Sequence, residues 1–548
     1  MRVTDPDCCT VATNVSWRSL ADEHESRLTR YAVVFCGETP MPTEPSENAG
    51  AHTISRRDVL LGAGTVLGAS LVPLGDADAQ SGPPDTGTIV FTHTTVVTND
   101  ADRRTLRDVS LAVQNDVIVQ LGDTDEILER FPQATIYDGR RKALLPGLIN
   151  CHAHLAATIA KGFNEDYGFP NSLDLPQSPA SLLSPEEATV MSTLAAVEGL
   201  RSGTTTMVQN VSNIAREAAS LAQTGQRWVF AESVRDITTV DGPMSPPRLA
   251  NSVPPEFSDE LRHQGMQRIH ELYETWHGKQ DGLISVFPAA ALVELASPEL
   301  LRDVREFADA HDLGYTIHMT QSQAEVDFML RYHGVRPAIF LERNGFLGPR
   351  LFAAHARYCD DTEIAALAES ETIITHQAAM AANRGVNPPI TALREAGCRI
   401  ALGTDNNHTD MLHVMKTAIS LERIQRNDDF PGLLPQPEDM LADACSGGAA
   451  AVNQSAMLGS LEVGRKADIL VIDTFKPHLT PSGRILSAWI HNGQPSDIEA
   501  VMVDGRFVMR DHHVLTLDET ALMEEASAIG ERVWGQILED GPLPVPTF

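Results

Sequence analysis

The chain lacks several features that mark particular classes of protein. Only seven of its 548 residues are cysteine, and none of them forms a Cys-x-x-Cys pair, so we expect no essential disulfide network. Basic residues are also scarce, because 42 Lys and Arg stand against 74 Asp and Glu and give a formal net charge of -32. A surface this acidic repels phosphate backbones and anionic membranes. We therefore expect a small-molecule partner, neutral or cationic, and no nucleic acid.

Length and overall composition point to a multidomain enzyme. A chain of 548 residues exceeds one ordinary domain, so a large barrel with an accessory domain is the natural expectation. A hydrophobic content of 42% and an aromatic content of 5% suit a globular enzyme. Beyond a leader described below, no apolar run approaches the ~18 residues that span a bilayer, so we expect no membrane span in the mature chain.

The most informative segment runs from Leu144 to His154 and reads Leu-Leu-Pro-Gly-Leu-Ile-Asn-Cys-His-Ala-His. An apolar run ends in a Pro-Gly turn, and a short apolar strand follows. Alternate side chains leave an extended strand on the same face, so His152 and His154 can point at one ion. Cys151 points to the opposite face, where we expect a packed thiol rather than a nucleophile. This segment predicts half of a metal site.

The remaining ligands must come from other segments. A catalytic zinc or iron takes about three or more protein ligands and keeps a position open for water. Four polar residues end later apolar strands: His318, His355, His376 and Asp405. A single histidine at a strand end is more often a hydrogen-bonded core residue than a ligand. Four such strand ends downstream of a His-x-His segment favour a metal site.

Apolar strands alternate with helices across residues 146–458. A helix is predicted to start at Ser184-Pro185-Glu186-Glu187, with an N-cap serine, a proline in the first turn and acids near the positive end of the helix dipole. Repeated strand-helix units of this length predict an α/β fold, namely a (β/α)8 TIM-like barrel. The active site of such a barrel lies at the C-terminal ends of its strands, where the polar residues are found.

A second domain is predicted from both ends of the chain. Short alternating strands separated by Asn-Asp turns fill residues 88–145, and the same pattern returns in residues 459–515. We infer one small β-sandwich domain beside the barrel. Residues 516–548 are expected to form a helical tail, and residues 80–87 form a linker rich in Pro, Gly and Ser.

The N-terminal residues resemble an export signal. Residues 1–54 show no periodic pattern of residues, so we predict no fold for them. Residues 55–79 begin with Ser55-Arg56-Arg57, continue through a moderately apolar, Gly-rich core and end in Ala77-Asp78-Ala79, which is the pattern of a twin-arginine signal peptide. A buried helix fits the length and flanks less well. Starting translation at Met41 would give a leader of conventional length. We expect a periplasmic or secreted enzyme.

Several motifs together resemble one family. They are Pro-Gly-Leu-Ile-Asn-x-His-x-His, Ile-His-Met-Thr-Gln, Ala-Ala-His, Thr-His-Gln and Leu-Gly-Thr-Asp. This series resembles the amidohydrolase superfamily, and within it the mononuclear branch of cytosine deaminase and the triazine hydrolases. The resemblance runs from about Thr88 to Asp511. Dimers are common in this family, so a homodimer is expected.

The resemblance implies a set of metal ligands. His152 and His154 would end the first barrel strand, His318 the fifth and Asp405 the eighth. Three imidazoles and one carboxylate suit Zn2+, with Fe2+ as the alternative. The fourth strand ends in Phe-Pro-Ala-Ala at residues 287–290 and offers no lysine to bridge two metals, so we predict one divalent ion.

The resemblance also assigns chemistry to these residues. A divalent ion lowers the pKa of bound water from about 15.7 toward ~7. Asp405 can then accept a proton from that water. His355 matches the histidine that hydrogen-bonds the water or the substrate, although a histidine that only holds a ligand in place is the alternative.

Other residues are predicted to line the substrate pocket. His376 and Asn383 lie in a segment that borders the pocket in relatives, and Asn406 follows Asp405 directly. We take these three residues as candidate substrate binders. His408, two residues further on, is expected to be a solvated loop residue.

Gln321 is the main departure from the family pattern. Deaminases of this branch usually carry His-x-x-Glu after the fifth strand, and the glutamate shuttles a proton to the ring nitrogen and to the leaving amine. Here the segment is His318-Met319-Thr320-Gln321. Glutamine can orient a substrate, but it cannot carry a proton. Glu325 would replace the missing glutamate only if the loop bends, and otherwise the leaving group should need little protonation.

Three functions remain open from the sequence. The leading hypothesis is a metal-dependent hydrolase of non-peptide C-N bonds in a heterocycle or amidine-type small molecule, with deamination as its commonest form. The first alternative keeps the metal site but acts as an amidase-like hydrolase or a hydrolytic dehalogenase. The second is a ligand-binding pseudoenzyme, motivated by Gln321.

Overall fold

The computed structural model describes residues 87–167, 177–406, 408–428, 432–539 and 541–545. The predicted leader and signal peptide lie outside the described residues, and so does Met41. The described part of the chain contains two sheets of different architecture.

Eight parallel strands form the central sheet, and each pairs with the next along the chain. A parallel bridge between Ala153 and Asp405 joins the first strand to the end of the last and closes the sheet into a barrel. The strands are β6 (Leu148–Ala153), β7 (Thr204–Val211), β8 (Arg227–Val234), β9 (Ile284–Leu292), β10 (Tyr315–Met319), β11 (Leu351–His355), β12 (Ile373–His376) and β13 (Arg399–Leu402). The predicted (β/α)8 barrel is confirmed.

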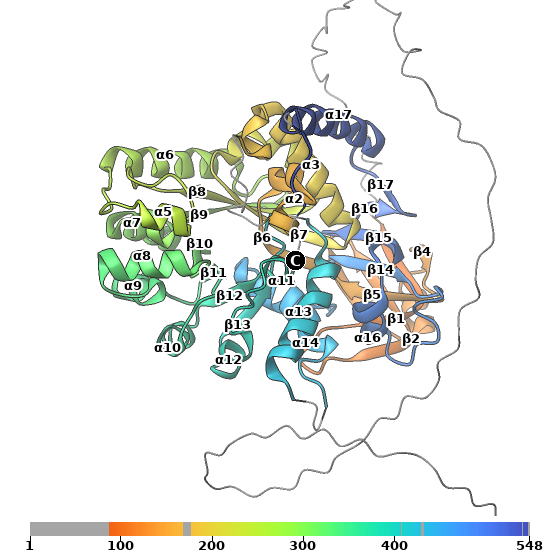
Figure 1. Ribbon diagram of the computed structural model, residues 1–548. Coiled ribbons are helices and arrows are strands. Elements are labelled where there is room, and N and C mark those ends of the chain that lie inside the picture. Colours follow the sequence, from red (N-terminus) through yellow and green to blue (C-terminus); the bar gives the residue numbers. More distant parts are fainter. Residues whose placement is uncertain (1–86, 168–176, 407, 429–431, 540, 546–548) are drawn as a thin grey trace, which may run out of the picture. The chain divides into compact units, whose positions relative to one another are not determined.

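Helices surround the barrel on its outer side (Figure 1). The larger ones are α3 (Pro185–Arg201), α6 (Asp259–Trp276), α7 (Pro298–Ala310), α8 (Gln323–His333), α10 (Asp361–Glu369) and α13 (Met411–Arg426). Shorter ones include α2 (Phe163–Tyr167), α4 (Ala218–Gln223), α5 (Pro246–Ala250), α9 (Pro337–Arg343), α11 (Ala378–Asn383), α12 (Ile390–Glu395), α14 (Pro437–Ala442) and α15 (Gly448–Ala451). Because helices cover one face of each strand and the barrel interior covers the other, strands such as β8 are buried at every position.

Local sequence signals fix where the helices begin. The Ser184 hydroxyl accepts a hydrogen bond from the backbone N–H of Glu187, and the Glu187 carboxylate accepts one from the backbone N–H of Ser184. This capping box starts α3 at the predicted place. Ser297 caps α7 in the same way by accepting from the N–H of Leu300 at 3.0 Å.

The second sheet is mixed and combines both ends of the chain. Its strands are β1 (Thr88–Val97), β2 (Thr105–Gln114), β3 (Val117–Gly122), β4 (Thr135–Asp138), β5 (Lys142–Pro146), β14 (Ile469–Asp473), β15 (Ile498–Val503), β16 (Arg506–Arg510) and β17 (His513–Val514), and α1 (Thr124–Arg130) and α16 (Ile485–Asn492) accompany them. Phe91 in β1 contacts Phe507 in β16, with ring centroids 6.2 Å apart, although β5, β14 and β15 separate these strands in the sheet. The sheet therefore curls around a shared core, as expected for a small sandwich built from both chain ends.

A buried arginine links the barrel to this second sheet. Arg227, at the start of β8, places Nη2 3.3 Å from an Asp468 carboxylate oxygen and 3.2 Å from an Asp504 carboxylate oxygen. The same Asp468 oxygen accepts from the backbone N–H of Asp504 at 2.8 Å. These ion pairs at the domain boundary offset part of the cost of burying three charged groups, although Nε of Arg227 and the second Asp468 oxygen have no hydrogen-bond partner among the described residues.

The C-terminal helix α17 (Glu519–Ile537) lies against α3, and Figure 1 shows it beside α2 and α3. Ile529 and Val533 pack on Met191 of α3. The indole N–H of Trp534 donates to the carbonyl of Ile159 at 2.9 Å, and Ile159 lies in the 3-10 turn Leu155–Ala160 that follows His154. The last helix therefore supports the segment next to the predicted metal site.

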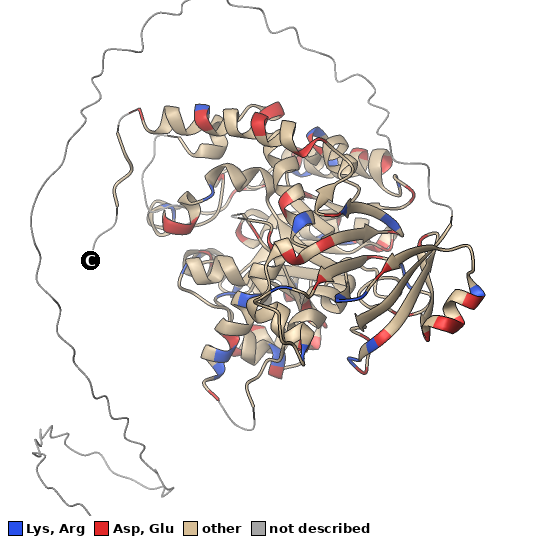
Figure 2. Cartoon of the chain, turned by 90° about the vertical axis from the view of Figure 1, so that its right-hand side faces the viewer, with Lys and Arg blue, Asp and Glu red and all other residues tan. Residues whose placement is uncertain are grey.

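Figure 2 shows acidic and basic residues mainly on the outer helices and turns, while the strands inside are largely uncharged. Across the described residues, no helix combines the length and the apolar character needed to cross a membrane.

Candidate metal centre and active site

The first and last barrel strands meet where three predicted site residues lie. The backbone N–H groups of Thr404 and Asp405 both donate to the carbonyl of His152, at 3.0 and 2.9 Å. The N–H of His154 donates to the carbonyl of Asp405 at 3.1 Å. Backbone hydrogen bonds therefore fix His152, His154 and Asp405 relative to one another, whatever occupies the site.

Two further residues support this junction. The side chain of Asn150 donates to the Thr404 hydroxyl at 2.8 Å and accepts from the N–H of Thr404 at 3.1 Å and from that of His152 at 3.3 Å. Gly403 lies so close to β6 that a Cβ atom there would be 2.8 Å from Cβ of His152. Any side chain at this position would push the two strand ends apart.

His154 and His318 face each other across the top of the barrel. Their Nε2 atoms are 3.1 Å apart, and Nδ1 of His318 donates to the carbonyl of Ala291 at 2.5 Å. Since that carbonyl can only accept, the Nε2 atom of neutral His318 carries a lone pair. Two nitrogens each ~2.0 to 2.1 Å from one ion, at angles of ~90 to 110°, lie about 2.9 to 3.4 Å apart. The observed separation fits a shared cation.

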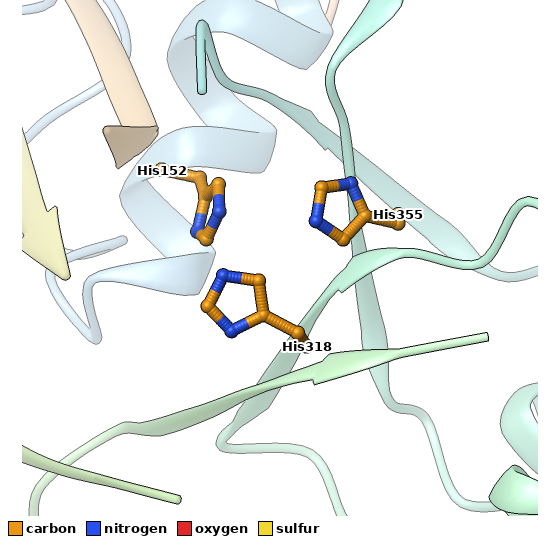
Figure 3. A group of neighbouring side chains, drawn as sticks. All are labelled: His152, His318 and His355. Atoms are coloured by element: carbon orange, nitrogen blue, oxygen red, sulfur yellow. The ribbon is translucent and has the colours of Figure 1, made fainter. Parts of the chain in front are cut away.

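His152 completes the cluster (Figure 3). Its ring centroid lies 4.7 Å from those of His154 and His318 and 5.4 Å from that of His355. Both of its ring nitrogens are buried and have no hydrogen-bond partner among the described residues. Leaving such groups unpaired costs about 1 to 3 kcal/mol each, so the arrangement is that of a ligand rather than of a core residue.

Asp405 lies between two imidazoles. One carboxylate oxygen is 3.7 Å from Nε2 of His154, and the other is 3.8 Å from Nδ1 of His355. Asp405 and His355 both adopt a positive φ, 68° and 81°, which residues other than glycine seldom do. Such backbone strain is typical of functional sites, where the surrounding structure holds it in place.

Donor atoms gather in two overlapping groups, in each of which the candidate ligand atoms lie within 4.8 Å of one another. One group is His152, His318 and His355, and the other is His152, His154 and Asp405.

Burial keeps these imidazoles neutral. It lowers the pKa of His152 and His355 well below the usual range, and the neighbouring histidines lower it further. Burial and then His154 lower the pKa of His318 to about 3. Neutral imidazoles offer lone pairs at neutral pH, which is what a metal ligand requires.

The residues present therefore fit a divalent metal ion. Buried imidazole nitrogens without partners and one carboxylate converge at the strand ends, and His152, His154, His318 and Asp405 would hold the ion. β9 runs to Leu292, two residues beyond the predicted end at Ala290, and contains no lysine that could bridge a second metal. This agrees with the prediction of a single ion, which stays a prediction. Cys151 is fully buried on the other face of β6, and burial raises the pKa of its thiol, as expected for a packed side chain.

The predicted substrate-binding residues are placed differently. Asn406 is buried and lines a small hollow together with His154 and Asp405, and its side-chain oxygen has no partner in the described part of the chain. His376 is buried at the end of β12, but it belongs to neither group of candidate ligands. Asn383 is exposed at the end of α11. Their roles stay predictions.

His408 is not the solvated loop residue that the sequence suggested. Its side chain is partly buried and lines the same hollow as Asn406. Its Nδ1 accepts from the backbone N–H of Asp410 at 3.2 Å, so Nε2 of the neutral ring carries the proton. Burial lowers the pKa of His408 to about 4. The expectation failed because His408 lines this hollow together with Leu155, Thr158 and Thr409, which partly cover it.

Gln321 and Glu325 form one structural unit. The carboxylate of Glu325 is fully buried and accepts from the backbone N–H groups of Thr320 and Gln321, both at 2.7 Å. Burial and the nearby Glu294 carboxyl raise the pKa of Glu325. Glu325 therefore holds the loop after β10 and does not replace the missing glutamate. Gln321 is 8% exposed, and its Nε2 has no partner among the described residues.

Sequence reasoning missed several residues of this site. Asn150, Gly403 and Glu325 act through backbone contacts, which no residue pattern announces. Arg357 is different, because it follows a predicted strand end by two residues, and a charged group at that position was a usable signal.

Comparisons with known proteins agree with this geometry. A model described as the amidohydrolase family matches residues 143–508. The chain is 30% identical over 423 residues to a 5'-deoxyadenosine deaminase of Methanothermobacter thermautotrophicus, covering 76% of this chain and 93% of the relative. It is 30% identical over 446 residues to a 5-methylthioadenosine/S-adenosylhomocysteine deaminase of Syntrophobacter fumaroxidans, covering 80% and 96%.

Solved structures share the fold. An adenosine deaminase from Xanthomonas campestris with bound zinc superposes with a TM-score of 0.71 at 26% identity, covering 83% of this chain and 100% of that one. The zinc complex of an atrazine chlorohydrolase from Arthrobacter aurescens TC1 gives a TM-score of 0.69 at 21% identity, covering 81% and 100%. At that identity the second likeness concerns the fold alone.

A (β/α)8 barrel with buried imidazoles and a carboxylate converging at its C-terminal strand ends defines a metal-dependent hydrolase. The family model spans most of the barrel and part of the second sheet. The chain belongs to the amidohydrolase family.

The cluster predicts how metal content depends on single residues. Purified enzyme should contain about one divalent ion per chain, and His152→Ala or His318→Ala should lower that content at least tenfold, because each removes a nitrogen from the cluster. Elemental analysis after gel filtration measures the ratio. His333→Ala, on α8 and away from the cluster, is the matched control. Unchanged metal content in both cluster variants would contradict the assignment.

Proposed function

We propose that this enzyme hydrolyses a C–N bond in a small amino-substituted heterocycle and releases ammonia. The observation that carries the proposal is the cluster of His152, His154, His318 and Asp405 at the strand ends, together with an orphaned amide donor on Gln321. The deaminase names of two relatives that align over more than nine-tenths of their own lengths support it. Neither the residues of the site nor the names of the relatives identify the heterocycle.

The chain's own residues divide the work as follows. A divalent ion bound at the cluster would supply Lewis acidity toward water and the substrate. Asp405 has one oxygen beside His154 and the other beside His355, so it is placed to accept the proton that attacking water loses. His355 is a neutral base, and its Nδ1 lies 3.8 Å from the second carboxylate oxygen of Asp405. It could relay that proton, or it could form a hydrogen bond with the group attached to the reacting carbon.

Gln321 orients the substrate in this proposal. Its Nε2 is a buried donor without a partner, and a ring nitrogen or carbonyl oxygen of a bound heterocycle would satisfy it. Glu325 keeps the loop in place through two backbone hydrogen bonds, which fixes the direction from which Gln321 approaches. Asn406 and His408 would line the far side of the substrate next to His154.

Gln321 also favours a second candidate. An amide side chain delivers no proton to a leaving amine, whereas a halide or a thiolate leaves without one. Hydrolytic dehalogenation of the same kind of ring is therefore the alternative, and it uses the same metal site. Amidase-like hydrolysis would instead rely on Asp405 or His355 for the proton.

A substrate panel tests the proposal. Enzyme reconstituted with zinc should release ammonia from at least one of adenosine, 5'-deoxyadenosine, cytosine, pterin or an aminotriazine, and chelation of the metal should abolish the activity. Ammonia is measured by a coupled assay, and chloride release from the matching chlorinated rings is measured in parallel. Chloride without ammonia would favour the alternative, and neither product from any ring would refute both.

Restoring the family carboxylate tests the role of Gln321. Gln321→Glu should raise kcat for amines about tenfold or more, because a carboxyl group can protonate the leaving nitrogen. KM should rise at the same time if the amide donor binds the substrate. The control is Gln323→Glu, an exposed position at the start of α8. If Gln321→Glu leaves both constants unchanged, Gln321 does not contact the substrate.

We propose Zn2+ as the resident ion, with Fe2+ as the alternative, because neutral imidazoles and one carboxylate suit both. A homodimer and the absence of any nucleic acid partner complete the proposal. The first rests on the family resemblance, and the second rests on the formal charge of -32.

We also propose that the enzyme is exported by the twin-arginine route, which carries folded proteins. The support is the sequence from Ser55 to Ala79 alone. Replacing Arg56 and Arg57 with lysine should move the full-length protein from the periplasmic to the cytoplasmic fraction of the expressing cell. Equal distribution of both forms would refute the proposal.

A further inference from the structure

Arg357 is a buried cation that has no counterion among the described residues. Its side chain belongs to a residue that is 8% exposed, directly after the strained turn that ends β11. In the part of the chain that the structure describes, its one hydrogen bond runs from Nε to the carbonyl of Val386 at 3.3 Å. Its guanidinium also lies 5.7 Å from the ring centroid of Tyr358. No described carboxylate approaches it within ion-pair distance.

Three other well-covered arginines are paired with carboxylates in the described part of the chain. Arg227 lies 3.3 Å from Asp468 and 3.2 Å from Asp504. Arg394 lies 3.1 Å from a Glu422 oxygen and 2.8 Å from an Asp443 oxygen, and Arg336 lies 2.7 Å from Glu363 and 2.9 Å from Asp360. A buried charge without a partner is costly, and this chain compensates the cost elsewhere. Arg357 differs from these three arginines, and it follows His355 of the active site by two residues.

A second arginine adds to the positive charge at this point. The charges of Arg357 and Arg384 both lower the pKa of the His355 imidazole, after burial and His318. Burial lowers the pKa of Arg384 to about 10, and burial likewise lowers that of Arg357, so both stay cationic at neutral pH. Arg384 follows α11, and Arg357 follows β11, so two separate segments bring their charges to one place.

Asp405 is the described carboxylate whose charge acts on Arg357, but its oxygens already face two imidazoles. Its two oxygens lie 3.7 and 3.8 Å from the imidazoles of His154 and His355, and it makes no ion pair with Arg357. Next to the carbonyl that receives the Arg357 hydrogen bond stands Asn387, whose buried side-chain oxygen and nitrogen have no partner among the described residues. The unsatisfied amide of Asn387 therefore belongs to the residue directly after the acceptor of the Arg357 hydrogen bond.

We propose that Arg357, assisted by the charge of Arg384, binds an anionic oxygen group of the substrate, such as a carboxylate or a phosphate. A planar guanidinium can donate two parallel hydrogen bonds to such a group, which are stronger than neutral ones. The inference rests on the proposed function in that it places the substrate at this site, and it narrows the substrate class to an amino-heterocycle that carries a negative charge.

This assignment reverses the expectation from the overall charge. A formal charge of -32 favours neutral or cationic partners at long range, but ions in solution screen that field beyond about 8 to 10 Å. At contact distance, the buried guanidinium and the metal site dominate. The pocket therefore favours anions, although the acidic surface of the protein repels anions at long range.

Matched probes test the subsite. Each ring in the deamination panel is compared with its carboxylate, its carboxamide and its phosphate ester, for instance 5'-deoxyadenosine with adenosine 5'-carboxylate, adenosine 5'-carboxamide and adenosine 5'-phosphate. Calorimetry on the zinc-loaded enzyme gives Kd for every probe, and ammonia release gives kcat/KM. For at least one ring, the anionic probe should bind at least tenfold more tightly than its carboxamide. The carboxylate and phosphate arms show which oxyanion is preferred.

Variants of Arg357 distinguish anion binding at this subsite from a general electrostatic attraction of anions to the pocket. Arg357→Met should reduce the ratio of anion to carboxamide affinity to within about twofold, and Arg357→Lys should restore part of it, since the charge returns without the planar fork. Arg331→Met is the matched control, because exposed Arg331 also lies over the tyrosine that follows it, 5.9 Å from the centroid of Tyr332. The control should keep the wild-type ratio. Metal content and the thermal midpoint report whether each variant is folded.

The outcomes distinguish the two proposals. If no ring releases ammonia but anionic probes bind in an Arg357-dependent way, the deaminase proposal fails and the subsite stands. If ammonia is released and no anionic probe binds better than its carboxamide in the wild-type enzyme, the subsite is refuted and the deaminase proposal stands. An anion preference that survives in Arg357→Met would also overturn the assignment, because the metal site alone would then explain it.

Discussion

The carbonyl of His152 accepts two backbone hydrogen bonds, from Thr404 and Asp405, and the site depends on this junction. Without it the barrel would remain an open sheet, and residues from the first and the last strand would not meet. The junction leaves room for no side chain at Gly403, and Asn150 supplies two further hydrogen bonds across it, both with Thr404. The positions of the metal-binding residues are therefore set by the backbone, and the imidazoles need only adopt their rotamers.

The unsatisfied groups of the site are informative because several of them converge at the strand ends. Buried polar atoms are nearly always hydrogen-bonded in native proteins. Around the strand ends, both nitrogens of His152, Nε2 of Gln321 and the side-chain oxygen of Asn406 are buried without a described partner. Each is a donor or an acceptor that the protein alone leaves unused. Together they fit the proposed ligands, a cation on one side and a polar, hydrogen-bonding ring on the other.

Much of this could be predicted from the sequence. The His-x-His segment, the polar residues that end apolar strands and the strand-helix alternation predict the barrel and place His152, His154, His318, His355 and Asp405 at one end of it, because parallel strands carry their C-terminal residues to a common edge. The family resemblance added the role expected of each residue, as a metal ligand or as the histidine that hydrogen-bonds the water or the substrate. The position of His408 was wrong because loop conformation depends on tertiary contacts that no local pattern encodes.

What the sequence could not give is the charge balance at the pocket. A net charge is a sum over the whole chain, whereas the pocket depends on which arginines find carboxylates. Arg227 and Arg394 find them, and Arg357 does not, although nothing in their local sequences distinguishes the three. Likewise, Glu325 looks like a displaced catalytic acid in sequence, and only its hydrogen bonds to Thr320 and Gln321 show that it supports the loop.

The contact between Trp534 and Ile159 joins parts of the chain that are far apart in sequence. The helix that buttresses the segment after His154 contributes Trp534, which lies 375 residues beyond Ile159. Asp405, too, is synthesised some 250 residues after His152. The coordination sphere of the cluster is therefore complete only after the barrel has closed and Asp405 has met His152, so we expect metal uptake to follow folding.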